Sequence, residues 1–488
     1  MTHLVMGPIL LPLATAVALA AMGGRRVRLE QAISLTATAL LLLLSLLLLR
    51  SAAAGETSVY RPGDWPSPFG IVLLLDRLSA LMLVATSLVA LGSVAYACLS
   101  GLRARYYHAL FQFQLAGLSG AFLTADLFNL FVFFEILLIA SYCLLTLGPT
   151  RSRLRVGLHY VVINLVGSTL FLVAVGTLYG LTGTLNLADL ALRVAALPAA
   201  DATVARSAAL LLFAVFALKA AVVPLHLWLP GTYAAAAPPV AALFAIMTKV
   251  GVYGIIRVAT LVFGPDAGVA AAVAGPWLLP VALATQMVGM AGALATRDLR
   301  RMQGYFLIGS VGTMLTGVGL FTHEGLTAAL YYLVHSTFAI AAMFLLADLI
   351  RRRSAGAGAL GLLFLFGAMA VVGLPPWSGF IGKALVLAAA PLDRVGAWVW
   401  GVTLLAGLVG VMASARMGGR LFWLPAPAGA AVVVVRRVRR SALAPVLGLF
   451  GAVVLLTMFG DAVTRYTRAT ADQLFAPQEY VRAVLPGR

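Results

Sequence analysis

The stretch LFNLFVFFEILLIASYCLLTL, residues 127–147, contains a single side chain that is charged at neutral pH, Glu135. Its other residues are apolar or uncharged, and about 20 such residues in a helix cross the hydrocarbon core of a lipid bilayer. The stretch therefore predicts a membrane-spanning helix with a carboxylate near its middle. Comparable apolar stretches lie on both sides of it along most of the chain.

We expect about fourteen membrane-spanning helices, and the predicted fold is an all-α polytopic membrane protein in which residues 1–488 form a single transmembrane domain. The alternating pattern of a membrane β-barrel is absent. Because arginines follow the first apolar stretch instead of preceding it, we expect that stretch to be a retained helix and not a signal peptide. The predicted spans are 3–23, 31–50, 71–98, 107–123, 127–147, 156–181, 206–228, 238–263, 271–295, 302–321, 325–350, 360–389, 396–415 and 441–460.

The composition excludes several classes of protein. Of the 488 residues, 62% are hydrophobic and only 10% are charged, whereas a soluble domain has about 25% charged residues. This excludes a soluble enzyme, a nucleic-acid-binding protein and a disordered chain. Cys98 and Cys143 lie in apolar stretches and the six histidines lack ligand spacing, so we expect no disulfide framework and no metal site. No nucleotide-binding glycine motif follows a strand, so we expect no cofactor.

The arginines are distributed unevenly over the predicted connections. Cytoplasmic connections of membrane proteins are enriched in arginine and lysine. We therefore expect the arginine-rich connections to lie in the cytoplasm and both termini, including the tail 461–488, to lie on the other side. Twenty of the 31 arginines (34 basic residues less three lysines) lie in alternate connections, namely Arg25, Arg26, Arg28, Arg103, Arg105, Arg151, Arg153, Arg155, Arg297, Arg300, Arg301, Arg351, Arg352, Arg353, Arg416, Arg420, Arg436, Arg437, Arg439 and Arg440.

The chain has only three lysines, Lys219, Lys249 and Lys383, and all three lie within or beside predicted spans. A desolvated lysine amine can gain and lose a proton near neutral pH, whereas arginine stays protonated. Lysines inside spans therefore indicate proton transfer. The alternative is that each lysine reaches the lipid headgroups from a span end.

Glu135 lies in the middle of its span, and we interpret it as the acidic partner of a lysine. An ionised carboxylate at that depth costs at least a few kcal/mol unless it pairs, takes up a proton or faces water. A neutral glutamic acid that donates to a backbone carbonyl is the alternative. His335, in YYLVHSTFAIAAMFLLADLI, is a further proton-transfer candidate because histidine titrates near neutral pH, but buried histidines are equally often only hydrogen-bonded groups.

Two predicted spans are interrupted beside a lysine. Pro224 follows Lys219 by five residues, and GLPPWSGFIGK places two prolines and two glycines before Lys383. Broken helices are tolerated in a membrane where they line a protein-enclosed or wet cavity. A matching pair indicates two inverted five-helix repeats, at residues 107–263 and 271–415. Ordinary proline kinks would explain each break alone, but not why both breaks carry a lysine.

Three motifs in order resemble the proton-translocating antiporter-like membrane subunits. They are DLFNLFVFFEILLIASYCLL around Glu135, ALKAAVVPLHLWLPGTYAAAAPPVAALFAIMTKVGVYGIIR at residues 217–257, and GLPPWSGFIGK before Lys383. This family includes three large subunits of respiratory complex I and the A-type and D-type subunits of Mrp cation/proton antiporters. The resemblance implies an ion pair of Glu135 with Lys219, a central relay at Lys249 and a gate at Lys383.

Details of the sequence are most similar to the D-type subunits of Mrp antiporters. LPGTY ends in Tyr233 where complex I members usually have a histidine, and the ending ATADQLFAPQEYVRAVL resembles the tail of the D-type subunits. Many relatives have a lysine shortly after the histidine of the eleventh span, but this chain has Phe338, Ala339 and Ile340 there. This departure puts the role of His335 in question.

The resemblance leaves two functions open. The first is a subunit of a secondary monovalent cation (Na⁺ or K⁺)/proton antiporter, which is not an enzyme, in a bacterial inner (plasma) membrane. Its expected partners are the lipid bilayer and other membrane subunits of A, B, C, E, F and G type. The second is a proton-pumping membrane subunit of a complex I-like NADH–quinone oxidoreductase or a membrane-bound hydrogenase.

Overall fold

The computed structural model of the chain describes residues 2–148, 150–352, 357–423 and 440–486. Within these ranges the protein is mostly helical, and eleven helices are long and apolar enough to cross a membrane. The predicted class of polytopic helical membrane protein is therefore confirmed. Arg353, Arg436, Arg437 and Arg439 of the predicted arginine-rich connections lie outside the described residues.

In the first half of the chain, two helices begin at the predicted residues 107 and 127, and four others begin four to six residues from their predicted starts. Four of the long helices of the chain begin at aspartates whose carboxylates accept a backbone N–H three residues on, at 2.8 or 2.9 Å. Such caps satisfy amide groups that a helix start leaves free. The helices are α1 (Gly7–Met22), α2 (Val27–Ala53), α3 (Arg77–Ser100), α4 (Tyr107–Leu123), α5 (Leu127–Thr146), α6 (Arg151–Thr182) and α7 (Leu187–Ala195). The four capping aspartates are Asp76 of α3, Asp126 of α5, Asp298 of α13 and Asp393 of α17.

Two of the three predicted spans that carry lysines are interrupted as expected from their prolines. In the span at 206–228, α8 (Ala202–Lys219) ends at the lysine and α9 (Trp228–Ala235) begins only at the last predicted residue. The span at 360–389 consists of α15 (Ala357–Val372) and α16 (Ser378–Ala388). A third interruption, which the sequence did not predict, divides 238–263 into α10 (Pro238–Phe244) and α11 (Met247–Leu261). The remaining long helices are α12 (Gly275–Ala295), α13 (Leu299–Gly319), α14 (His323–Arg351), α17 (Arg394–Gly418) and α18 (Leu443–Met458).

The C-terminal tail also is helical. It forms α19 (Gly460–Leu474) and α20 (Pro477–Val484), and α19 packs against α14 and α3. Short single-turn helices complete the described chain: η1 (Thr2–Met6), η2 (Pro62–Asp64), η3 (Ala199–Asp201), η4 (Gly268–Ala270), η5 (Gly419–Trp423) and η6 (Arg440–Ala442).

The expectation of a purely helical chain is wrong for the connection between α2 and α3. Strands β1 (Ser58–Tyr60) and β2 (Leu73–Leu75) pair there in antiparallel fashion, with Ser58 opposite Leu75. Several prolines and glycines lie between the two strands, and they disfavour helix. The extended segments on either side of this loop satisfy their backbone groups by pairing with each other.

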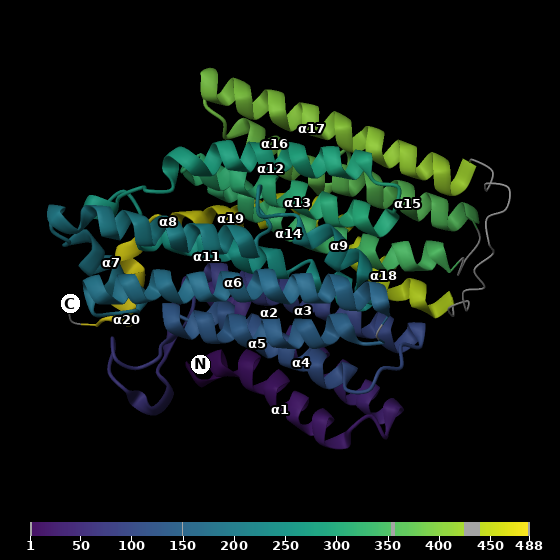
Figure 1. Ribbon diagram of the computed structural model, residues 1–488, viewed down its shortest axis with the longest axis horizontal. Coiled ribbons are helices and arrows are strands. Elements are labelled where there is room, and N and C mark those ends of the chain that lie inside the picture. Colours follow the sequence, from purple (N-terminus) through teal and green to yellow (C-terminus); the bar gives the residue numbers. More distant parts are fainter. Residues whose placement is uncertain (1, 149, 353–356, 424–439, 487–488) are drawn as a thin grey trace.

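The helices that carry the central lysine and the histidine form the core of the bundle. In Figure 1 the long helices lie side by side, with α1 at one edge and α17 at the other. All residues in the most apolar part of α10–α11 are buried and 94% of those in α14 are buried, but only 28% of those in α17. Lys249 on α11 and His335 on α14 therefore lie inside the protein and away from lipid.

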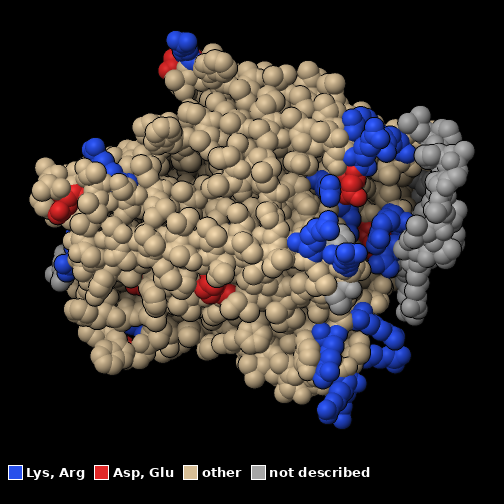
Figure 2. Space-filling view, viewed as in Figure 1, with Lys and Arg blue, Asp and Glu red and all other residues tan. Residues whose placement is uncertain are grey.

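Arginines gather at one end of the bundle, on the right in Figure 2, and we call this the arginine-rich end. It contains the α1–α2, α3–α4, α5–α6 and α12–α13 connections and the end of α14. Arginines in one connection donate hydrogen bonds to backbone carbonyls of another connection. Arg105 donates to the carbonyl of Gly23 at 3.1 Å, and Arg153 donates to the carbonyl of Ala235 at 2.9 Å. The chain ends lie toward the opposite side in Figure 1.

Helices α12 and α13 approach each other through glycines. A Cβ added to Gly312 would lie 2.6 Å from the Cα of Gln286 and 2.8 Å from the carbonyl oxygen of Ala282, both backbone atoms of α12. Small residues allow such close approach between helices in a membrane, where packing replaces the hydrophobic effect as the driving force.

We predict that Gly312→Ala destabilises the chain, because the methyl group would push the backbones of α12 and α13 apart. Such overpacking typically costs about 1–3 kcal/mol. Thermal unfolding of the purified full-length chain in detergent, followed by tryptophan fluorescence, measures this. Gly407→Ala on α17 is the matched control, because no atom lies within 4 Å of its added Cβ. Equal melting temperatures for the two variants would contradict the packing described.

Candidate functional site

Glu135 and Lys219 each contact a polar residue of α6, one turn apart. Ser168 donates its hydroxyl to Oε1 of Glu135. One turn earlier on the same helix, the side-chain and main-chain oxygens of Asn164 each accept a hydrogen bond from Nζ of Lys219, at 3.4 Å. No ion pair within 4.0 Å joins Glu135 to Lys219 among the residues that the structure describes. The two predicted partners therefore lie together, with α6 side chains between them.

The α6 residues form a polar stripe that the sequence reading missed. Tyr160, Asn164 and Ser168 are spaced by four residues and so share one face of the helix. The amide nitrogen of Asn164 donates to the carbonyl of Tyr160 at 2.9 Å, and the Tyr160 hydroxyl is 2.9 Å from that of Ser141 on α5. The four-residue spacing of polar side chains within a predicted span was the available signal.

Lys219 is the last residue of α8, where the helix breaks. Helix C-termini carry free carbonyls and a partial negative charge, which stabilise a cation. The indole of Trp228 donates to the carbonyl of Leu218 at 3.2 Å, and the hydroxyl of Thr285 on α12 accepts the amide of Val223 at 3.1 Å. The break before Pro224 is therefore stabilised by specific partners from α9 and α12.

Lys249 lies alone at the centre of the protein. It is 0% exposed, and its Nζ has no hydrogen-bond partner among the described residues. It belongs to the first turn of α11, where the helix dipole disfavours a positive charge. Burying an unpaired ammonium costs free energy. This position therefore suits an amine that binds a proton only transiently during transfer.

Lys383 and His335 converge on the free C-terminal end of α15. Nζ of Lys383 donates to the carbonyl of Val372 at 2.7 Å, and Nε2 of His335 lies 3.0 Å from the carbonyl of Ala370. The other ring nitrogen of His335 lies 2.8 Å from the hydroxyl of Ser378, the first residue of α16. The break around Pro375 and Pro376 thus exposes carbonyls that these two side chains satisfy.

His335 shares the C-terminal end of α15 with Lys383, because the two side chains contact the carbonyls of Ala370 and Val372. Its ring is fully buried on α14. Three residues further along α14 is Phe338, in the segment where the family resemblance implies a lysine. A second histidine, His226, lies between α8 and α9. Its Nδ1 has no hydrogen-bond partner among the described residues.

The site therefore consists of two polar clusters, each at a helix break, with Lys249 between them. Nothing in the described part of the chain groups three or more metal-ligating side chains. The arrangement suits groups that exchange protons one after another, because each lysine is buried (6%, 0% and 6% exposed for Lys219, Lys249 and Lys383) and faces few fixed charges.

Comparisons with known proteins identify the family of the chain. A sequence model of the family described as NADH:quinone oxidoreductase/Mrp antiporter, TM matches residues 124–414. The chain is 43% identical to the D-type subunit of a probable K⁺/H⁺ antiporter of Rhizobium meliloti (99% of this chain, 97% of the relative). It is 35% identical to the D-type subunit of an Na⁺/H⁺ antiporter of Alkalihalophilus pseudofirmus (99% and 100%).

A solved structure of the Mrp complex from Dietzia sp. contains a chain of the same fold. The TM-score is 0.89 at 29% identity, and the match covers 99% of this chain and 100% of that one. The family model covers more than half of the chain, and the two relatives match it almost end to end. The chain belongs to the NADH:quinone oxidoreductase/Mrp antiporter membrane-subunit family.

Proposed function

We propose that this chain is the D-type subunit of a multi-subunit monovalent cation (Na⁺ or K⁺)/proton antiporter and that it carries the protons. This proposal depends on one observation. The three buried lysines, Lys219, Lys249 and Lys383, each lie at or beside a helix break in the centre of the bundle. Such groups are costly in a membrane protein and occur where ions move. The names of the full-length relatives support the D-type assignment.

A proton-pumping subunit of a redox-driven complex is the second function that we considered. The family as described includes quinone oxidoreductase subunits, and the same line of lysines would serve either machine. The antiporter is favoured because relatives that match nearly the whole length of the chain are antiporter subunits. A secondary transporter of this kind catalyses no chemical conversion and needs no redox cofactor in this chain.

In the proposed mechanism, the ionic state of Glu135 controls Lys219. When Glu135 is ionised, its negative charge favours the ammonium form of Lys219, which lies across the Ser168 and Asn164 side chains from it. When Glu135 takes up a proton, this support is lost and Lys219 releases its proton toward Lys249. Lys249 then passes it to the cluster of His335 and Lys383, where the α15 carbonyls stabilise the charge.

The partner subunits would cover a specific face of α5. Glu135 is only half-buried, and Phe128, Val132 and Ile139 on the same helix face are 51%, 38% and 57% exposed. A carboxylate that is open to lipid is strongly unfavourable. A neighbouring membrane subunit, of the A, B, C, E, F or G type, would shield it and complete the proton route.

We also propose the membrane topology of the chain. The chain would cross a bacterial inner membrane fourteen times, with two inverted repeats at 107–263 and 271–415 around the breaks beside Lys219 and Lys383. The arginine-rich end would face the cytoplasm, and both termini with the tail 461–488 would lie outside. The gathering of arginines at one end of the bundle supports this orientation.

We predict that Glu135→Gln and Lys219→Ala each abolish cation-dependent proton flux while the complex still assembles. The first substitution removes the switchable charge, and the second removes the group that responds to it. Flux is measured in vesicles that carry the full complex. Glu56→Gln is the matched control, because Glu56 also accepts a serine hydrogen bond (Ser51, 2.6 Å) but lies exposed in the α2–α3 connection. Wild-type flux in either site variant would refute the coupling.

Substitution of lysine by arginine separates proton transfer from fixed charge. We predict that Lys249→Arg and Lys383→Arg reduce flux nearly as strongly as alanine does, because arginine cannot release its proton at working pH. The same flux assay measures this effect. Since the chain has no exposed lysine, the control is Arg465→Lys in the exposed pair with Asp461. Full flux with arginine at either site would show that a permanent positive charge suffices there.

A further inference from the structure

Helix α11 carries three functional side chains in line. Lys249, Tyr253 and Arg257 are spaced by four residues and so lie along one face of the helix. From Lys249 to Arg257 the helix rises by about 12 Å, and it runs away from the arginine-rich end. The two residues beyond Lys249 have no part in the site described above.

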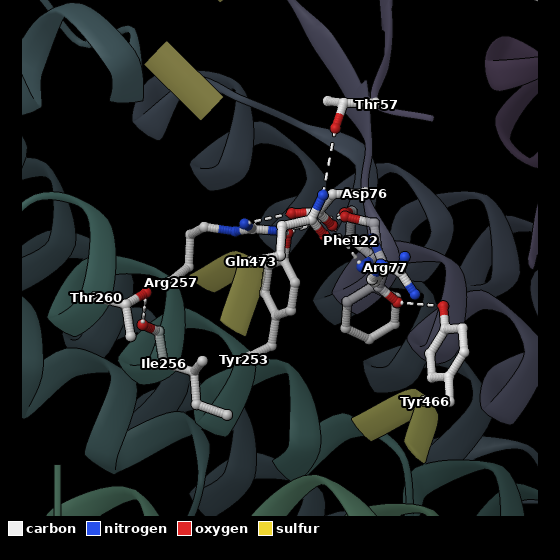
Figure 3. A network of polar contacts seen from close by, with 11 residues as sticks. Thr57, Asp76, Arg77, Phe122, Tyr253, Ile256, Arg257, Thr260, Tyr466 and Gln473 are labelled. Atoms are coloured by element: carbon white, nitrogen blue, oxygen red, sulfur yellow. Dashed lines mark hydrogen bonds and ion pairs between the residues drawn. The ribbon is translucent and has the colours of Figure 1, made fainter. Parts of the chain in front are cut away.

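Arg257 is buried at the end of this line in an ion pair with Asp76, the N-cap of α3 (Figure 3). The two groups are 2.6 Å apart, and their side chains are 5% and 3% exposed. Burial opposes ionisation of Asp76, but the charge of Arg257 and hydrogen bonds from Arg257 and Ser79 outweigh it and hold the pKa of the carboxyl below its usual range. Asp76 is therefore a buried carboxyl group whose charged form is stabilised by Arg257 and Ser79.

The Tyr253 hydroxyl contacts the Arg257 end of the line. It donates to the carbonyl of Phe122, at the end of α4, at 2.9 Å, and it accepts a hydrogen bond from Arg257 at 3.3 Å. One guanidinium thus contacts both the Tyr253 oxygen and the Asp76 carboxylate. In Figure 3 the Tyr253 side chain extends from α11 toward this carboxylate.

Residues of the C-terminal tail cover the Asp76–Arg257 pair. Tyr480 of α20 lies with its ring 5.4 Å from the guanidinium, and Gln473 of α19 accepts from the amide of Arg77 and donates to Thr57. A small cavity of about 10 Å³ lies between these residues, Asp76 and Arg257, which is room for about one water molecule. Nε of Arg257, on the wall of this cavity, has no protein partner among the described residues.

A purely structural ion pair is the simpler explanation of Asp76 and Arg257. Buried pairs, however, are weak contributors to stability, and apolar residues of similar size often replace them at no loss. A structural pair would also not require the Tyr253 hydroxyl, which lies between the pair and Lys249 along α11. Nor would it require a small polar cavity beside the unpartnered Nε of Arg257. The alignment with Lys249 distinguishes the two explanations.

We propose that Tyr253 is a relay residue that passes protons between Lys249 and the Asp76–Arg257 pair, which forms a terminus of the proton route at the end opposite the arginines. In the transfer, water carries a proton from the Lys249 ammonium to the Tyr253 oxygen. The hydroxyl that donates to the Phe122 carbonyl turns away from it, and its proton passes through water to the Asp76 carboxylate. Tyr253 ends with the proton count it began with, and Arg257 stays charged. Asp76 then releases the proton to water in the cavity beneath the tail.

The inference rests on the proposed proton transport, and one pair of variants tests it. Tyr253→Phe removes only a hydroxyl, so the fold is expected to persist, but flux through the full complex in vesicles should fall by about a hundredfold, the scale of a lost proton-transfer group. Tyr466→Phe is the control: its hydroxyl donates to the carbonyl of Arg77 at 2.8 Å in the same network but lies off the α11 line. It should retain wild-type flux.

The outcomes separate this inference from the proposed function. Flux in Tyr253→Phe equal to that in Tyr466→Phe, with an active wild-type complex, overturns the relay and leaves the antiporter proposal intact. An inactive wild-type complex overturns the antiporter proposal itself. The double variant Asp76→Asn/Arg257→Gln, which buries no unpaired charge, should assemble without transporting. Wild-type flux in that variant, or loss of assembly in it, would show that the pair is only structural.

Discussion

A lipid bilayer offers no hydrogen-bond partner to a freed backbone carbonyl, so every break in a spanning helix must be satisfied from within the protein. The break after α15 is satisfied by the amine of Lys383 and the ring of His335, which bond the carbonyls of Val372 and Ala370. At the break after α8, Trp228 and Thr285 contact the backbone, and Lys219 ends the helix. The broken helices and the buried basic side chains therefore depend on each other.

This dependence explains how the protein keeps titratable groups in its core. The C-terminal end of α15 and the oxygens of Asn164 on α6 provide the partial negative charge that a buried cation needs, whereas Lys249, in the first turn of α11, has no such partner among the described residues. In the proposed mechanism, a proton is therefore held at the two breaks and is bound only briefly between them. In the account proposed, Glu135 shifts this balance at one break, and Tyr253 leads away from the middle toward Asp76.

Much of this was predictable from residue type and depth. Glu135 and the three lysines are conspicuous because ionisable groups are rare inside apolar spans, and the prolines at 224, 375 and 376 located two of the breaks. The contacts of Asn164 and Ser168 could not be predicted, because uncharged polar residues are common in membrane-spanning helices. The partnership of Asp76 with Arg257 joins residues 181 positions apart, and no local pattern reports such a contact. The α10–α11 break lacks an internal proline, and the β1–β2 pairing depends on contacts across a loop.

The measurement that tests the central claim most directly is proton movement in vesicles that carry the complete complex, with no electron donor or quinone present. An inward-directed gradient of Na⁺ or K⁺ is imposed, and the internal pH is followed with a trapped dye. The account predicts proton movement opposite to the cation gradient, and none in vesicles that lack the complex. Proton movement that occurs only after an electron donor is added would contradict it and would identify a redox-driven pump.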